Sequence, residues 1–216
     1  MRVSLATTLP IDSLRVPLHA LDYVGVAVFA ISGALAAARR RHDVVTFVVF
    51  SVITGMGGGT LRDLLIGAPV FWVHSGIYLW VCLGAALAVW IVGERPWRYA
   101  ALNWFDAIGL AAYAAIGSAK ALSYGVSPVV AVAMGIMTAT FGGILRDLFA
   151  GEPSVLLRRE IYMTAALLSA SLYVGLAWLG VDPWVAAGVA FLGGFALRAG
   201  AIAFGWTLPG FEVRDA

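Results

Sequence analysis

The chain has 216 residues, of which 62% are hydrophobic and only 12% are charged, and its formal net charge is +2. Soluble domains usually contain about 25% charged residues, so a water-soluble fold of this size could not bury this much apolar surface. Composition therefore indicates an all-α integral membrane protein. The small net charge gives no reason to expect a nucleic-acid partner, and the single cysteine, Cys82, excludes an intrachain disulfide.

Apolar stretches of membrane-spanning length follow a short N-terminal tail. Residues 1–17 lack an unbroken apolar region, so they are interpreted as a tail rather than a signal peptide. A helix needs roughly 20 apolar residues to cross a hydrocarbon core. Seven stretches qualify: 18–38, 44–65, 74–92, 103–122, 127–149, 159–180 and 183–205. Residues 206–216 form a C-terminal tail.

Basic residues in the short loops predict the orientation of these spans. Alternate loops carry the arginines, at positions 39, 40, 41, 95, 98, 158 and 159. The loops at 66–73, 123–126 and 180–182 contain no lysine or arginine. Because arginine-rich loops stay in the cytoplasm, we expect a multi-pass protein of the cell inner (plasma) membrane, with its N-terminus outside and its C-terminus cytoplasmic.

An internal duplication organises the chain. At an offset of 84 residues, TGMGGGTLRDLLIGAP (54–69) matches TATFGGILRDLFAGEP (138–153) at nine of sixteen positions, and D-x-x-G-x-x-x-[FY]-A-x-x-G begins at both Asp22 and Asp106. We therefore expect a first repeat at 18–93, a second at 103–180, and a seventh span, 183–205, outside the symmetry. Three spans per repeat is an odd number, so the second repeat should be inverted, as in many transport proteins.

Glycine clusters recur at matching places in spans two and five. They are Gly55, Gly57, Gly58, Gly59, Gly142 and Gly143. Glycine weakens a helix, and a break at membrane depth would offer carbonyls to an ion, with hydroxyls such as those of Thr60 and Thr138 beside them. Close helix packing is the alternative, because small residues let helix backbones approach each other. Recurrence in the inverted repeat favours a conduction or binding element.

Ionisable residues within spans are costly in lipid and normally face a bundle interior or water. Asp22 lies about four residues after the start of span one, and Arg62 lies about four residues before the end of span two. Both therefore lie roughly 6 Å deep on the same side of the membrane. Asp106 and Arg146 occupy the equivalent places in the other leaflet, so we predict an Asp22–Arg62 and an Asp106–Arg146 ion pair at opposite mouths of a pathway. Alternatively, the aspartates favour helix N-termini while the arginines reach the head groups. The carboxylates that follow the two arginines, Asp63 and Asp147, belong to the same candidate pathway.

Two further basic residues lie inside spans. Lys120, near the end of span four, is either a membrane-surface anchor or a mobile charge that adjusts conduction. Arg198, in span seven, is interpreted as a membrane-surface anchor. The sequence contains no motif of a metalloprotease, serine hydrolase or P-loop enzyme, so no enzymatic activity, cofactor or metal site is expected.

The duplicated G-G-G-T-L-R-D and F-G-G-I-L-R-D blocks, within seven spans arranged as 3+3+1, resemble the prokaryotic branch of the trimeric intracellular cation (TRIC) channel family. The resemblance covers about residues 18–205. It implies a homotrimer with a potassium-permeable pore in each protomer, lined by the first two helices of each repeat and gated at glycine kinks at 57–59 and 142–143. Lys120 is the nearest match to a basic residue tied to voltage gating in animal members, although the chain reads K-A-L where those members have K-E-V.

The resemblance also implies a membrane-lipid partner, an anionic lipid other than the phosphoinositide bound by animal members. An inverted repeat would serve a secondary transporter of a small solute such as glycine as well as it serves a channel. Unitary potassium currents would favour the channel, and saturable uptake coupled to a gradient would favour the transporter.

Overall fold

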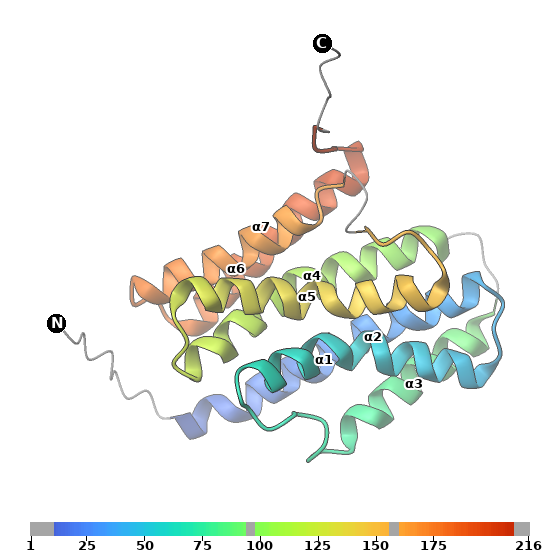
Figure 1. Cartoon of the computed structure of the whole chain (residues 1–216), viewed down its shortest axis with the longest axis horizontal. Coiled ribbons are helices and arrows are strands. Elements are labelled where there is room, and N and C mark those ends of the chain that lie inside the picture. The colour runs from blue at the N-terminus through green and yellow to red at the C-terminus, as the bar shows by residue number, and fades with distance from the viewer. Residues whose placement is uncertain (1–10, 94–97, 156–159, 210–216) are drawn as a thin grey trace, which may run out of the picture.

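The described residues of the computed structural model are 11–93, 98–155 and 160–209. Within them the chain is all-α, as expected, with seven helices (Figure 1). The helices are α1 (Ile11–Arg39), α2 (Val44–Leu65), α3 (Ile77–Val92), α4 (Arg98–Ser123), α5 (Pro128–Ala150), α6 (Met163–Trp178) and α7 (Pro183–Phe204). The expected tail segments 1–10 and 210–216, and Arg95, Arg158 and Arg159, lie outside the described residues.

Several helix boundaries differ from the predicted spans. Helix α1 begins at Ile11 rather than at 18, because the backbone is already helical in residues 11–17, which are too polar to be predicted as part of a membrane span. Helices α3 and α6 have 16 residues each, fewer than the stretches 74–92 and 159–180 predict. The residues before α3 form turns, including a bond from the Ser75 N–H to the Trp72 carbonyl. Within the described ranges, five helices (α1, α2, α4, α5 and α7) are long and apolar enough to cross a membrane.

The polar and glycine-containing breaks act as helix caps. Asp43 caps α2 by accepting the Thr46 N–H at 2.8 Å, a bond that lowers the pKa of this carboxyl below its usual value. Helix α5 begins at Pro128, and Gly151, whose φ of 63° is left-handed, caps its C-terminal end. Helix α7 also begins with a proline, Pro183, and the Asp182 carboxylate caps it by accepting the N–H groups of Trp184 and Val185. These breaks therefore fix where each helix stops.

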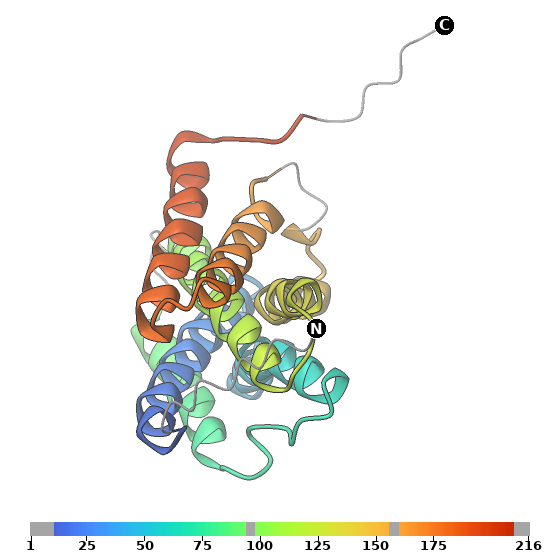
Figure 2. The ribbon, with the colours of Figure 1, turned by 90° about the vertical axis from the view of Figure 1, so that its left-hand side faces the viewer.

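The two repeats run in opposite directions. In Figure 1, α1 and its counterpart α4 are antiparallel, and so are α2 and α5. Viewed from the side, α1–α3 and α4–α6 form two halves that meet along α1, α2, α4 and α5, while α7 packs outside them on α4 and α6 (Figure 2). The loop after α1 meets the end of α5, where Arg40 pairs with Glu152 at 3.0 Å. The inverted 3+3 arrangement plus one helix is therefore confirmed.

Burial is reversed relative to a soluble protein. Ile91 and Val129 are 79% and 81% exposed, whereas Arg62 and Arg146 are 2% and 1% exposed. Large apolar side chains cover the outside, and alanines fill much of the space between the helices. A surface of this kind is stable against lipid chains and would be unstable against water.

Helices α2 and α5 cross in backbone contact at two glycines. A Cβ added at Gly58 would lie 2.1 Å from the Thr138 carbonyl oxygen, and one added at Gly142 would lie 2.3 Å from the Thr54 carbonyl oxygen. Both helices continue unbroken through these positions, so the prediction that the glycine clusters interrupt spans two and five is wrong. The alternative interpretation, close packing, describes Gly58 and Gly142.

We predict that Gly58→Ala and Gly142→Ala each destabilise the protein by about 1–3 kcal/mol, because the added methyl meets backbone that cannot move aside without separating the helices. The midpoint of heat-induced loss of the folded peak in detergent measures this effect. Gly84→Ala, in α3, is the matched control, because nothing lies within 4 Å of its Cβ position. Equal midpoints for Gly58→Ala and Gly84→Ala would contradict the prediction.

Candidate functional site

A first set of buried charges surrounds the end of α2. This α2 cluster comprises Asp22, Arg62, Asp63, Tyr78, Tyr113 and Lys120. Arg62 binds its sequence neighbour Asp63 through Nε at 2.9 Å and Nη2 at 2.8 Å. Lys120 Nζ lies 2.8 Å from the same carboxylate, and the Phe71 N–H donates to it at 3.1 Å. Asp63, which is fully buried, therefore accepts from two cationic side chains and one backbone amide.

Asp22 has different partners from those predicted. Its carboxylate accepts the Tyr78 hydroxyl at 2.8 Å and the Tyr113 hydroxyl at 3.2 Å. No ion pair within 4.0 Å joins Asp22 to Arg62 in the described part of the chain, so that predicted pair is wrong. The two phenolic hydroxyls occupy the carboxylate, and Arg62 turns to Asp63 instead.

A second set surrounds the end of α5. This α5 cluster comprises Ser32, Asp106, Arg146, Asp147 and Tyr162. Arg146 Nη1 binds Asp106 at 2.5 Å, which confirms the predicted pair, and the same nitrogen donates to the Ser32 hydroxyl at 2.6 Å. Arg146 Nε binds Asp147 at 2.9 Å, and the Val155 N–H donates to Asp147 at 3.0 Å. The arginines are therefore buried within the bundle and do not extend to head groups.

The two clusters are related by the 84-residue offset. Tyr78 corresponds to Tyr162 (78 + 84) and Phe71 to Val155 (71 + 84), which the sequence motifs did not single out. Phe71 and Val155 make the same backbone bond to the aspartate of their own repeat. The signal that could have found Tyr78 and Tyr162 is the offset itself, extended into spans three and six.

Several buried polar atoms, some of them in the two clusters, have no hydrogen-bond partner in the protein. Among the described residues they include Thr54 Oγ1, Arg62 Nη1, Asp106 Oδ2, Ser118 Oγ and Tyr162 Oη. An unsatisfied buried polar group costs about 1–3 kcal/mol, so native proteins usually satisfy such groups with protein or ordered water. These atoms therefore provide hydrogen-bonding positions for water, and the carboxylate and hydroxyl oxygens among them can contact a cation.

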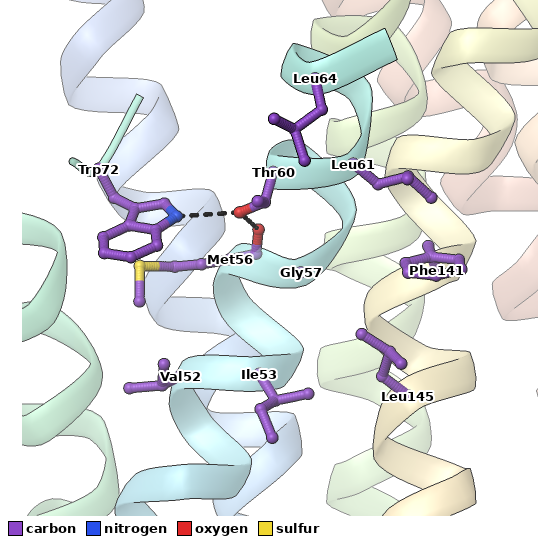
Figure 3. Close-up of a pocket in the computed structure, with 10 residues that line it drawn as sticks. All are labelled: Val52, Ile53, Met56, Gly57, Thr60, Leu61, Leu64, Trp72, Phe141 and Leu145. Atoms are coloured by element: carbon purple, nitrogen blue, oxygen red, sulfur yellow. Dashed lines mark hydrogen bonds between the residues drawn. The ribbon is translucent and has the colours of Figure 1, made fainter. Parts of the chain in front are cut away.

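Other predicted site residues lie elsewhere. An apolar groove of about 340 Å³ between α2 and α5 includes Gly57 and Thr60 (Figure 3). Thr60 accepts the Trp72 indole N–H at 2.9 Å and donates to the Met56 carbonyl at 2.7 Å, so its hydroxyl has partners already.

The remaining glycines and Thr138 serve close packing. A Cβ on Gly55 would lie 3.1 Å from the Val26 carbonyl, and one on Gly59 would lie 2.7 Å from the Phe71 ring. Thr138 donates to the Met134 carbonyl at 2.6 Å. Gly143 alone borders a charged cluster, because a Cβ there would lie 2.9 Å from the Tyr162 hydroxyl oxygen and 3.4 Å from Asp106 Oδ1.

Arg198 is not a membrane-surface anchor. It is 3% exposed, binds Glu160 at 2.7 Å and lies over the Tyr162 ring at 5.2 Å. Helix α7 therefore contacts the α5 cluster through Tyr162. A small polar hollow of about 20 Å³ adjoins the same cluster, and its lining includes Arg146, Asp147 and Glu152.

Known proteins match the chain over most of its length. Residues 19–94 and 103–178 each match the model of a family described as glycine transporter, and the two matches are offset by 84 residues at both ends (103 − 19 and 178 − 94). A membrane protein of the UPF0126 group from Vibrio cholerae is 38% identical over 202 residues, which cover 91% of this chain and 83% of the relative.

Solved structures match as well. The trimeric intracellular cation channel orthologue from Rhodobacter sphaeroides is 45% identical, with a TM-score of 0.84 over 88% of this chain and 99% of that one. A prokaryotic TRIC channel solved in 0.5 M KCl is 32% identical, with a TM-score of 0.81 over 90% of this chain and 100% of that one. The family model that matches both repeats, the relatives that match over most of their length and the fold all agree. This multi-pass membrane protein therefore belongs to the prokaryotic branch of the TRIC channel family.

Proposed function

We propose that the chain forms a homotrimeric channel for potassium and other monovalent cations, with a separate pathway in each protomer. The observation that carries the proposal is the set of unpartnered buried polar atoms on Thr54, Arg62, Asp106, Ser118 and Tyr162. Thr54 and Arg62 on α2 and Asp106 on α4 belong to helices that contact the other repeat, and the contact between inverted repeats is the usual place for a transport pathway. Solved relatives named as cation channels support the same conclusion.

Paired charges make this pathway compatible with cations. An isolated arginine at membrane depth would repel a passing cation, but each buried arginine here has a carboxylate partner. Lys120 shares Asp63 with Arg62, so the α2 cluster retains a basic side chain that is 26% exposed. Lys120 is the basic residue in the best position to adjust conduction.

Gating is proposed at the crossing of α2 and α5. The backbone contacts at Gly58 and Gly142 leave no room for a Cβ between the two helices. Separation of this contact, with bending at residues 57–59 and 142–143, would open the centre of the pathway. Glycine lowers the cost of such bending because it lacks the side chain that stabilises a helix.

The proposed orientation places the N-terminus outside and the C-terminus in the cytoplasm of the inner membrane. Arg39 is the last residue of α1 and Arg40 and Arg41 follow it, at the same end of the bundle as Glu152 and the α5 cluster. This end would then be cytoplasmic, and its arginines suit an anionic lipid head group.

The matched family is described as glycine transporter, so a secondary transporter of glycine is the second candidate, although the solved relatives do not favour it. Liposomes loaded with KCl decide between the two functions. We expect the purified protein to produce unitary potassium currents in planar bilayers and rapid, non-saturating potassium efflux from the liposomes. Saturable, gradient-coupled uptake of labelled glycine without step-like currents would contradict the channel.

Neutralising Lys120 should raise potassium conductance. Lys120→Gln removes a positive charge beside the pathway, and a Coulomb energy of about 1 kcal/mol at 4 Å in water corresponds to a rise of roughly fivefold at low salt. Lys120→Arg is the matched control and should conduct like the wild type. At 1 M KCl the Debye length falls to about 3 Å, so salt screens the Lys120 charge and the difference in conductance should shrink. An equal conductance for Lys120→Gln and Lys120→Arg in dilute KCl would exclude this role.

Removing the α5 arginine should destabilise the fold. Arg146→Met leaves Asp106 and Asp147 buried without their cation, at an expected cost of about 3–5 kcal/mol. Adding Asp106→Asn to Arg146→Met should recover part of this loss, because one uncompensated carboxylate disappears. Thermal midpoints in detergent give both values, and a double variant no more stable than Arg146→Met would show that the pair contributes little.

A further inference from the structure

The two repeats hold equivalent aromatic rings in equivalent places. The Tyr113 ring packs on Gly25 of α1, where an added Cβ would lie 2.6 Å from ring carbon Cε2. Its counterpart Phe29 (29 + 84 = 113) packs on Gly109 of α4, where an added Cβ would lie 3.0 Å from the ring. The ring centroids are 5.4 Å apart, at the contact between α1 and α4. The glycines therefore seat both rings in the same way.

Only one of these rings carries a hydroxyl. Gly25 lies one helical turn after Asp22, so a ring seated on Gly25 directs its para position to the Asp22 carboxylate. Tyr113 bonds this carboxylate at 3.2 Å and the Asp22 carbonyl at 3.1 Å. Phe29, seated on Gly109 one turn after Asp106, has no hydroxyl to offer Asp106. The difference between the repeats at this point is a single oxygen atom.

The arginines differ in the corresponding way. Arg146 Nη1 binds both Asp106 and Ser32, whereas Arg62 Nη1 is buried without a hydrogen-bond partner. Ile116 occupies the position equivalent to Ser32 (32 + 84 = 116), so the second partner of Arg146 has no counterpart beside Arg62. Arg62 consequently retains an unused donor, while Asp22 accepts from tyrosines in place of an arginine.

We propose that Tyr113 determines the partner of Asp22. Its hydroxyl holds this carboxylate away from Arg62, and in its absence Arg62 Nη1 pairs with Asp22 as Arg146 pairs with Asp106. The consequence for transport, which rests on the proposed function, is that Asp22 keeps a charge uncommitted to arginine and attracts cations at this mouth of the pathway. Lys120 does not compete, because Asp63 holds it through both oxygens.

The structure of the Tyr113→Phe variant tests the choice of partner without any assay of transport. In the full-length variant we expect an oxygen of Asp22 within 4 Å of Arg62 Nη1. The reciprocal variant Phe29→Tyr should form a bond from the new hydroxyl to Asp106, whose Oδ2 has no partner in the wild type. An Asp22 side chain that remains on Tyr78 in Tyr113→Phe, with Arg62 unmoved, would overturn the proposal.

Potassium flux tests the consequence. Tyr113→Phe should lower potassium efflux from liposomes about threefold to tenfold, and Asp22→Asn should lower it similarly. In the Asp22→Asn background, adding Tyr113→Phe should change nothing further, whereas a merely structural role would lower flux again and overturn the assigned role. Tyr173→Phe, outside both clusters, is the control for loss of a tyrosine hydroxyl. If the wild type passes no potassium, the proposed function fails, while the variant structure still decides the partner of Asp22.

Discussion

The pairing of Arg62 and Arg146, each with the aspartate that follows it in the chain, is the constraint on which this structure depends. A guanidinium at membrane depth without a partner would cost several kcal/mol, so Arg62 and Arg146 must be neutralised inside the bundle. Asp63 and Asp147 do this locally. Each carboxylate is held in turn by a backbone N–H from the segment after its helix, at Phe71 and Val155. The ends of α2 and α5 are therefore fixed to the loops that follow them.

Duplication supplied two copies of this arrangement, and later substitutions made them unequal. The change from phenylalanine at 29 to tyrosine at 113 adds one hydroxyl, and the change from serine at 32 to isoleucine at 116 removes another. Lys120 corresponds to Ala36 (36 + 84 = 120) and adds a charge to the α2 cluster alone. The proposed pathway would therefore meet different side chains at its two mouths, although the fold is nearly symmetric.

Helix packing explains how polar atoms persist between these clusters. The glycines at the crossing of α2 and α5 meet the backbones of Thr138 and Thr54. The hydroxyls of these two threonines lie against Gly117 of α4 and Gly33 of α1 rather than in lipid. The large apolar side chains are displaced to the outside, where lipid chains stabilise them as well as a protein core would. Small residues inside and large ones outside leave room for buried hydroxyls that a leucine-rich core would have excluded.

The sequence alone determined the membrane environment, the number of helices, the duplication and the Asp106–Arg146 pair, because hydropathy, repeat offset and depth are one-dimensional properties. It indicated the wrong partner for Asp22 and a break at the glycines. Both depend on which atoms approach from other helices: Tyr113 reaches Asp22 across 91 positions, and Gly58 meets the Thr138 backbone of α5. Tertiary structure decides such competition, because a carboxylate binds the donor that packing brings nearest, and a glycine can serve contact as readily as bending.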